Sequence, residues 1–348
     1  MTPSDTRQQR IRTALIGCGR QATWILHPAI GVLPRYEVVA CCDVNREAAT
    51  RAAQRFAGAR VYESHGEMLA REELDAAVIA TTPENHAAIV ADCLRTGLHA
   101  FVEKPPAKTV EEARALVALS QETGRQVMVG FMMRFRPLNA WAARIAAEMA
   151  QPPALFNLHV GVGLWRSKVK GYSGTLYFLL SVGIHYFDLI RFFLGEVHQV
   201  DARLVEYGEG RAAYAMLLDC ARGVCIFDLN SCEQLTFTDD RRLGGHVNER
   251  WDLVGPGTAL HLENCDTLTW LRTDGRVERY QPSYLGLSFL EGQAYYIGGY
   301  YQELAEFAAS IDEGRAPAVT IEDGCRALEI VFAVARSAQT GEKVRVED

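Results

Sequence analysis

The first 130 residues alternate between strand-like and helix-like patterns of apolar positions. Short apolar or β-branched runs predict strands at Arg12–Ile16, Tyr36–Cys42, Ala76–Ala80, Leu98–Val102 and Val127–Gly130. Helical spacing predicts helices at Ala22–Leu33, Arg46–Phe56, His86–Thr96 and Val110–Glu122. Strands that alternate with helices in this way predict a parallel sheet with right-handed crossovers, so we expect an α/β fold here.

After Gly130 the pattern changes, and apolar residues alternate with polar ones. The predicted strands are Leu155–Val162, Gln199–Glu206, Ala212–Leu218, Gly223–Asn230, Arg250–Val254 and Ala259–Leu262. Such alternation is typical of a mostly antiparallel sheet with one exposed face. Further helices are predicted to end near Met149 and to occupy Ile184–Leu194, Tyr301–Ile311 and Ile321–Ser337. We therefore expect two domains: residues 1–130, and an α+β domain with a large open sheet at residues 131–348.

The composition excludes several classes of protein. The 348 residues are 49% hydrophobic and 23% charged, with a net charge of -7. No basic surface is expected, which argues against a nucleic-acid or anionic-membrane partner. The most apolar stretch, Thr175–Gly195, contains His185, Asp188 and Arg191, which disfavours a membrane span. Met1–Arg12 is polar, so no signal peptide is predicted.

Cysteine and histidine usage points to a cytoplasmic protein without a metal. The nine cysteines form no CxxC pair, and apolar packing in a reducing compartment accounts for them better than disulfides. The nine histidines show no HExxH or other ligand spacing, so no metal site is expected.

A glycine-rich turn connects the first predicted strand to the first helix. Gly17-Cys18-Gly19-Arg20-Gln21-Ala22 fits the G-x-G-x-x-G/A pattern. Gly17 allows the tight turn, Gly19 lets the backbone approach a pyrophosphate, and Ala22 allows the helix to pack closely on the strand. In this strand–turn–helix context the motif predicts a dinucleotide-binding Rossmann domain.

Asp43 ends the second strand, near the spacing expected for an acceptor of a ribose 2′-OH. Its negative charge would repel a 2′-phosphate, so we expect NAD rather than NADP. Arg46 is a possible phosphate partner, but a solvated helix residue is the simpler interpretation. The loop Thr81-Thr82-Pro83 with Asn85 and His86 follows the third strand; it either borders the dinucleotide or only caps the next helix.

Glu103-Lys104-Pro105 follows a buried strand, at the sheet edge where open α/β folds bind ligands. A surface ion pair is the alternative interpretation. The complete set of expected cofactor-binding residues is Gly17, Gly19, Arg20, Gln21, Asp43, Thr81, Thr82, Pro83, His86, Glu103 and Lys104.

Four motifs together resemble the glucose-fructose oxidoreductase/inositol dehydrogenase/MocA family. They are the glycine turn, Glu103-Lys104-Pro105, Val129–Pro137 and Gly183–Leu189, and the resemblance spans essentially the whole chain. It implies a nicotinamide-dependent dehydrogenase or reductase that acts on sugars, inositols or related polyols. It also implies that Lys104 and His185 are catalytic, His185 as an acid or base and Lys104 as a hydrogen-bond donor to the reacting oxygen.

One position departs from that family's usual D-x-G-x-H-x-x-D pattern, because Ser181 replaces the first aspartate. A serine keeps a hydrogen bond but loses the charge, which puts the ordinary polyol site in doubt. Tyr172 or Tyr177 is an alternative source of a hydroxyl group. Asp188, three residues after His185, either orients the imidazole or contacts its own helix.

Other substrate-binding candidates come from the second domain. Trp165 and Arg166 follow its first strand, Arg134 lies near the domain junction, and Asn248 and Tyr300 are weaker candidates. The expected substrate-binding set is Lys104, Arg134, Trp165, Arg166, Tyr172, Ser181 and His185.

We expect an NAD-dependent sugar or polyol oxidoreductase. The alternatives are an NAD-retaining glycosidase-like enzyme and a non-catalytic regulator that binds dinucleotide and sugar. The open sheet also predicts a homodimer or homotetramer.

Overall fold

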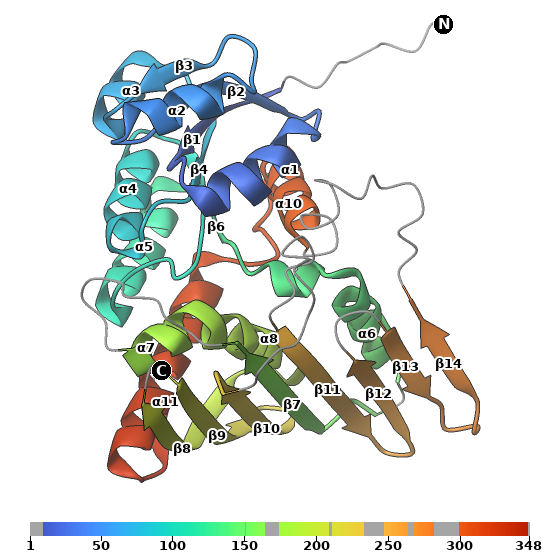
Figure 1. Ribbon diagram of the computed structural model, residues 1–348. Helices are drawn as coiled ribbons and strands as arrows, with labels where there is room; N and C mark the ends of the chain where they lie inside the picture. The colour runs from blue at the N-terminus through green and yellow to red at the C-terminus, as the bar shows by residue number, and fades with distance from the viewer. Residues whose placement is uncertain are drawn as a thin grey trace, which may run out of the picture. The chain divides into compact units, whose positions relative to one another are not determined.

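The computed structural model describes residues 10–149, 151–163, 174–208, 211–232, 247–263, 267–281 and 299–346. The chain forms two compact units, drawn in Figure 1. The first contains the described residues up to Gly130 together with Tyr300–Cys325, and the second contains those in Phe131–Gly299 and Arg326–Asp348. We expected the second domain to run without interruption from residue 131, whereas Tyr300–Cys325 packs with the first unit.

The described strands of the first unit form a six-stranded parallel sheet in the order β3-β2-β1-β4-β5-β6. Their bounds are β1 Ile11–Ile16, β2 Tyr36–Cys42, β3 Arg60–Tyr62, β4 Ala76–Ile79, β5 His99–Val102 and β6 Val127–Val129. This is the doubly wound order, with its topological switch point between β1 and β4. The α/β fold predicted from the sequence is therefore confirmed, although the short strand β3 had no recognised signal.

The helices of the first unit begin with an irregular segment. A π-helix, Ala22–Leu26, leads directly into α1, His27–Gly31, where the sequence predicted one continuous helix. The others are α2 Arg46–Ala53, α3 His65–Arg71, α4 Pro83–Arg95 and α5 Val110–Thr123. The side chains of Asn45, Ser64 and Thr109 cap α2, α3 and α5 by accepting a hydrogen bond from a backbone N–H of the first turn.

Two later segments complete the first unit: helix α10, Tyr300–Glu313, and the start of α11, Ile321–Thr340. The Tyr36 hydroxyl donates to the Leu304 carbonyl at 2.6 Å. A Cβ atom on Gly324 of α11 would lie 2.8 Å from Val129, so only glycine lets this helix approach β6 so closely. These contacts explain why a segment distant in sequence belongs to the dinucleotide-type domain.

The described strands of the second unit form a nine-stranded sheet in the order β14-β13-β12-β11-β7-β10-β9-β8-β15. Their bounds are β7 Leu155–Val162, β8 Val197–Gly208, β9 Arg211–Cys220, β10 Gly223–Asn230, β11 Val247–Gly255, β12 Thr258–Glu263, β13 Thr267–Leu271, β14 Val277–Tyr280 and β15 Val344–Arg345. Neighbours are antiparallel except β7 and β10. The mostly antiparallel sheet is confirmed, and β13, β14 and β15 extend it beyond the predicted strands.

Among the described elements of this unit, helices cover one face of the sheet and leave the other open (Figure 1). They are α6 Pro137–Glu148, α7 Gly174–Phe178, α8 Ile184–Leu194 and the rest of α11, with a 3-10 turn at Met132–Phe135 and a π-helix at Leu179–Gly183. The rings of Phe156, Phe193 and Trp251 meet edge to face or tilted, with centroids 5.4–5.7 Å apart, between α8 and the sheet.

The helical run Gly174–Leu194 is long and apolar enough to cross a membrane by length and composition alone. However, 67% of its most apolar window is buried within the protein, as is normal for a core helix. The three polar residues noted from the sequence lie in its second half, where His185 and Asp188 are themselves buried.

Candidate active site

Three loops of the first unit leave adjacent strands at the same edge of the sheet. The glycine turn follows β1, Thr81-Thr82-Pro83 follows β4, and Glu103-Lys104 follows β5. Because β1, β4 and β5 are consecutive and parallel, their carboxyl ends place these loops side by side. The sequence-predicted cofactor residues of these loops therefore gather on one edge.

The two glycines of the turn have different surroundings. Gly17 has a φ of +94°, and a Cβ atom there would lie 2.4 Å from the Ala80 carbonyl oxygen. Its own N–H donates to the Cys42 carbonyl at 2.8 Å. Gly19 is exposed, and a Cβ atom there would meet nothing within 4 Å. Gly17 is required by the fold, whereas Gly19 leaves open space above the turn, as close approach of a pyrophosphate needs.

Asp43 connects the end of β2 to the glycine turn. One carboxylate oxygen accepts from the Cys18 N–H at 2.7 Å, and the other accepts from the Asn45 N–H at 2.8 Å. Each oxygen keeps a further lone pair for a ribose hydroxyl. Arg46 forms an exposed ion pair with Glu63 at 2.8 Å, which agrees with its interpretation as a solvated helix residue.

Arg20 and Gln21 of the turn make different contacts. Arg20 is exposed and stacks over the Trp24 ring at 4.9 Å. Gln21 hydrogen-bonds to the Glu103 carboxylate, and its amide nitrogen lies 3.5 Å from the Tyr300 hydroxyl. Gln21 therefore links the glycine turn to the loop after β5 and to helix α10.

Taken together, the turn fits a dinucleotide. The open space at Gly19 and the half-buried acceptor Asp43 suit a pyrophosphate and an adenosine ribose respectively. Bound nicotinamide would supply hydride acceptance or donation, a chemistry that no amino-acid side chain provides.

His86 joins two of the loops instead of lying open to a ligand. Its ring is buried, with Nδ1 2.7 Å from the Pro105 carbonyl and Nε2 3.1 Å from the Thr81 carbonyl. Burial lowers the pKa of this imidazole. Thr82 caps α4 without a side-chain bond to its backbone, and the Asn85 amide donates to the Thr82 hydroxyl at 3.0 Å.

Lys104 lies half-buried at the end of β5, beside the buried carboxylate of Glu103. Desolvation lowers the pKa of Lys104, and the Glu103 charge opposes that shift. Burial likewise raises the pKa of Glu103. An amine with a lowered pKa at a ligand-binding edge is suited to proton transfer, so the surface ion pair considered from the sequence does not describe this group.

In the second unit, His185 occupies the first turn of α8 and is buried. Its ring meets Phe131 edge-on, with centroids 6.1 Å apart. The π-helix that precedes α8 ends at Gly183, where a Cβ atom would come within 3.2 Å of Leu229 on β10. A π-turn often occurs at functional sites, and here it precedes the candidate histidine by two residues.

Asp188 does not act on His185 alone, because Arg134 holds it. The Arg134 guanidinium donates to both Asp188 carboxylate oxygens, at 2.8 and 2.5 Å, and Asp188 is fully buried. These bonds tie α8 to the turn Met132–Phe135, and they do not decide between the two alternatives for Asp188. They also give Arg134 a structural partner, so its expected role in substrate binding has no support from the described contacts.

Of the remaining substrate candidates, three lie within the described residues and three lie outside them. The Ser181 hydroxyl donates to the Tyr177 carbonyl at 2.7 Å, one turn back on the same helical run. Asn248 lies half-buried on β11, and Tyr300 belongs to the first unit. Trp165, Arg166 and Tyr172 lie outside the described residues.

Sequence analysis missed a buried carboxyl group. Glu303, in the first turn of α10, is fully buried. The signal was present, since Glu303 lies four residues before Phe307 and shares the apolar face of the predicted helix.

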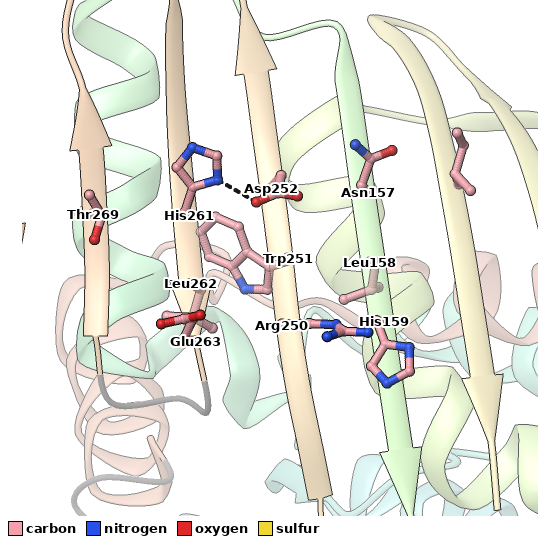
Figure 2. A pocket seen from close by; sticks show the side chains of 11 residues that line it. Asn157, Leu158, His159, Arg250, Trp251, Asp252, His261, Leu262, Glu263 and Thr269 are labelled. Atoms are coloured by element: carbon pink, nitrogen blue, oxygen red, sulfur yellow. Dashed lines mark hydrogen bonds and ion pairs between the residues drawn. The ribbon is translucent and has the colours of Figure 1, made fainter. Parts of the chain in front are cut away.

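A groove of about 360 Å³ on the open face of the second sheet was also not predicted (Figure 2). Polar residues of β7, β11 and β12 line it, among them His159, Arg250, Asp252 and His261. It contains neither Lys104 nor His185. Within the described ranges, no three His, Cys, Asp or Glu side chains gather as metal ligands would.

Two family models match the chain. Residues 11–131 match the GFO/IDH/MocA model described as an oxidoreductase family with an NAD-binding Rossmann fold, and residues 270–346 match the C-terminal alpha/beta domain of the same family. Among solved structures, a dehydrogenase from Chromobacterium violaceum has a TM-score of 0.84 at 20% identity, covering 95% of this chain and 96% of its own. This likeness supports the fold.

Several curated relatives are dehydrogenases. A D-apiose dehydrogenase from Paraburkholderia graminis is 33% identical over 58% of this chain, and the match spans 54% of that protein. The scyllo-inositol 2-dehydrogenase (NAD(+)) of Bacillus subtilis is 24% identical over 98% of this chain and 97% of its own length. A D-xylose 1-dehydrogenase of Haloferax volcanii, 26% identical over 90% of this chain and 93% of its own length, is named for NADP(+).

Proposed function

Because the chain belongs to the GFO/IDH/MocA oxidoreductase family, we propose that it transfers a hydride between NAD and a secondary hydroxyl or ketone of a sugar, inositol or related polyol. The chain is a dehydrogenase or reductase acting on CH–OH groups. The substrate class follows the names of the relatives, which are apiose, inositol and xylose dehydrogenases.

The observation that supports the proposal best is the position of Lys104. It stands at the carboxyl end of β5, at the edge that also holds the glycine turn, and its pKa is lowered by desolvation. Oxidation of an alcohol requires that the hydroxyl proton leave as the hydride departs. An amine with a lowered pKa can hydrogen-bond the reacting oxygen and accept that proton.

His185 is the second group proposed for the reaction. Imidazole exchanges protons near neutral pH, and the family motif around this residue supports a role as acid or base. Its buried position on α8 holds the ring in a fixed orientation against Phe131.

NAD is preferred in this proposal over NADP. The charge of Asp43, beside the glycine turn, supports this preference because it would repel a 2′-phosphate. Arg46, the nearby cation considered from the sequence, is paired with Glu63. The relative named for NADP(+) shows that both cofactors occur among similar proteins.

Ser181 bears on the choice of substrate. Its hydroxyl donates to a backbone carbonyl of its own helix and carries no charge, unlike the aspartate of the family pattern. We therefore expect a substrate that does not need a charged acceptor there, and a panel must extend beyond inositols to ketoses, aldoses and their lactones.

The test is a Lys104→Met variant assayed against such a panel with NAD and with NADP. We expect kcat to fall by about 10²–10⁴-fold, which is the usual contribution of a positioned acid or base. NADH binding, followed by its fluorescence, should change far less than kcat. Lys108→Met, a neighbouring half-buried lysine, is the matched control and should keep wild-type activity. Equal activity in both variants would contradict the role of Lys104.

A further inference from the structure

Glu303 is a buried carboxyl group that the proposed reaction does not use. Its side chain is fully buried, and neither carboxylate oxygen has a hydrogen-bond partner. Within the same unit, Glu103 is 6% exposed and its Oε1 atom also has no partner. A buried polar atom without a partner costs free energy, so three such oxygens in one unit need a physical explanation.

The fold brings the two carboxyl groups toward each other. Phe101 and Glu103 are two residues apart on β5 and its extension, so their side chains share a face. Phe307 and Glu303 are four residues apart on α10 and also share a face. The rings of Phe101 and Phe307 are in contact, with centroids 6.0 Å apart. The ring contact holds the segments that carry Glu103 and Glu303 together, and the two carboxyl groups are near enough to repel each other.

The electrostatic environment agrees with this proximity. Burial raises the pKa of Glu303 well above its ordinary range, and repulsion from Glu103 adds to the shift. The Glu103 pKa is also raised by burial, although Lys104 and Gln21 favour its charged form. Glu103 therefore has a cationic and an amide partner, whereas the carboxyl group of Glu303 has no hydrogen-bond partner.

The other ionisable groups near Glu303 do not supply a counter-charge. The Tyr36 hydroxyl, whose pKa is raised mainly by burial, donates to the Leu304 carbonyl. Farther along, Arg35 and Asp312 form an ion pair with each other. Lys104 interacts with Glu103, whose charge favours the ammonium form of the lysine.

We propose that Glu303 is a positioning residue for Lys104: it remains a neutral carboxylic acid at neutral pH, so that the pair Glu103–Glu303 presents one negative charge to the lysine instead of two. A proton on Glu303 also provides a donor where the unpartnered atoms of both side chains are all acceptors. Two carboxyl groups that share a desolvated site commonly keep one proton between them.

This inference rests on the proposed function, because it matters only if Lys104 exchanges a proton with the substrate. A second carboxylate beside Lys104 would stabilise its ammonium form and raise its pKa. With Glu303 neutral, the pKa of Lys104 stays lowered, as its burial dictates.

The chain allows a direct test, because it has five lysines: Lys104, Lys108, Lys168, Lys170 and Lys343. Lysine labelled with ¹³C at Cε gives one NMR signal for each residue, and the signal lost in Lys104→Arg identifies Lys104. Its titration is followed in the full-length wild type and in Glu303→Gln. Glu103→Gln is the sensitivity control, and Glu306→Gln, on the same helix and paired with Arg315, is the matched control.

We expect Glu303→Gln to leave the Lys104 midpoint within about 0.3 pH unit of the wild type, since an amide resembles a protonated acid. Glu103→Gln should lower that midpoint by about one unit or more, because it removes the charge that favours the ammonium form. A drop in Glu303→Gln as large as that in Glu103→Gln would show that Glu303 is ionised and would overturn the proposal.

Stability against pH gives an independent measurement. A group whose native pKa is raised contributes fully below its unfolded pKa of about 4.3, and this contribution is lost as pH rises toward the native pKa. Glutamine has no such loss. The urea midpoint of Glu303→Gln should therefore rise relative to that of the wild type as pH increases, equivalent to about tenfold in the unfolding constant for each pH unit.

A difference in urea midpoint that does not change between about pH 5 and 8 contradicts a raised native pKa. If Glu303→Gln does not fold, Glu303→Leu, which is also neutral, serves in both measurements. Neither measurement uses a substrate, so a failure of the polyol assay leaves their outcome unaffected. Conversely, an active enzyme with an ionised Glu303 would refute this inference and keep the proposed function.

Discussion

The expected preference for NAD over NADP depends on a single carboxylate, that of Asp43. It holds the glycine turn through the Cys18 N–H and the start of α2 through the Asn45 N–H. Its charge thus serves both the shape of the turn and the discrimination against a 2′-phosphate. Replacing Asp43 with asparagine, which has the same shape and no charge, tests the two roles separately.

In Asp43→Asn the amide oxygen can still accept a hydrogen bond from one backbone N–H. We expect the ratio of kcat/KM for NAD to kcat/KM for NADP to fall by about tenfold or more, because one repulsive charge at hydrogen-bond distance is worth about 1–2 kcal/mol. Steady-state kinetics with both cofactors measures this ratio. Glu37→Gln, at the opposite end of β2, should leave it unchanged. An unaltered ratio in Asp43→Asn would show that selectivity originates elsewhere.

The glycine turn shows how one short element combines folding with binding. Gly17 is enclosed by the end of β4 and adopts a backbone conformation that other residues avoid, whereas Gly19 has open space in front of it. The same substitution at the two positions should therefore have different consequences.

We expect Gly17→Ala to lose about 2–4 kcal/mol of stability, because its Cβ atom would overlap the Ala80 carbonyl and φ would be strained. Gly19→Ala should change stability by less than about 0.5 kcal/mol but weaken NADH binding by about tenfold or more, since the methyl group occupies the path of the pyrophosphate. Urea unfolding and fluorescence titration test both variants. Equal NADH affinity in Gly19→Ala and the wild type would show that the pyrophosphate does not pass close to Gly19.

The local patterns predicted this turn and the principal strands because each signal lies within a few residues. The periodicity of Ala22–Leu33 did not reveal that the helix starts as a π-helix, since π and α turns bury nearly the same positions. The three-residue strand β3 is too short to show alternation. These misses concern length and hydrogen-bond register, which hydrophobic patterning does not encode.

The other features that the sequence did not predict depend on contacts between residues distant in sequence. The return of Tyr300–Cys325 to the first unit depends on packing such as Tyr36 against Leu304, which no local pattern contains. Arg134 pairs with Asp188, 54 positions away, so its role in the protein could not be distinguished from substrate binding. The candidate catalytic residues were recognised only because several motifs occurred in a family-specific order.

The proposed chemistry does not use the open face of the second sheet. In the register of the strands, one row runs across seven of them. Its members are Asp201, Leu217, Ile226, Asn157, Asp252, His261 and Thr269. Ile226 is 51% exposed and Leu217 is 40% exposed, and the two lie opposite each other on β10 and β9.

Acidic side chains on this face lie beside histidine or arginine side chains. His159 pairs with Asp228 at 2.9 Å, His261 pairs with Asp252, and Arg250 faces Glu263 in the strand register. A surface that offers both signs beside an exposed apolar patch can be complementary to itself, as a two-fold symmetric interface requires. We propose that a second copy of the chain covers this face, which also protects the apolar residues from solvent.

Ile226→Arg tests this proposal by placing a charge at the centre of the apolar patch. We expect the wild type to sediment as a dimer or larger assembly and the variant to shift toward the monomer, because an unpaired charge buried in an interface costs several kcal/mol. Since Ile226 points outward from its strand, far-UV circular dichroism should be unchanged. Val32→Arg, an equally exposed apolar site of the first unit, is the control and should keep the wild-type mass. If the wild type is monomeric, or if Ile226→Arg keeps its mass, the open face serves some purpose other than self-association.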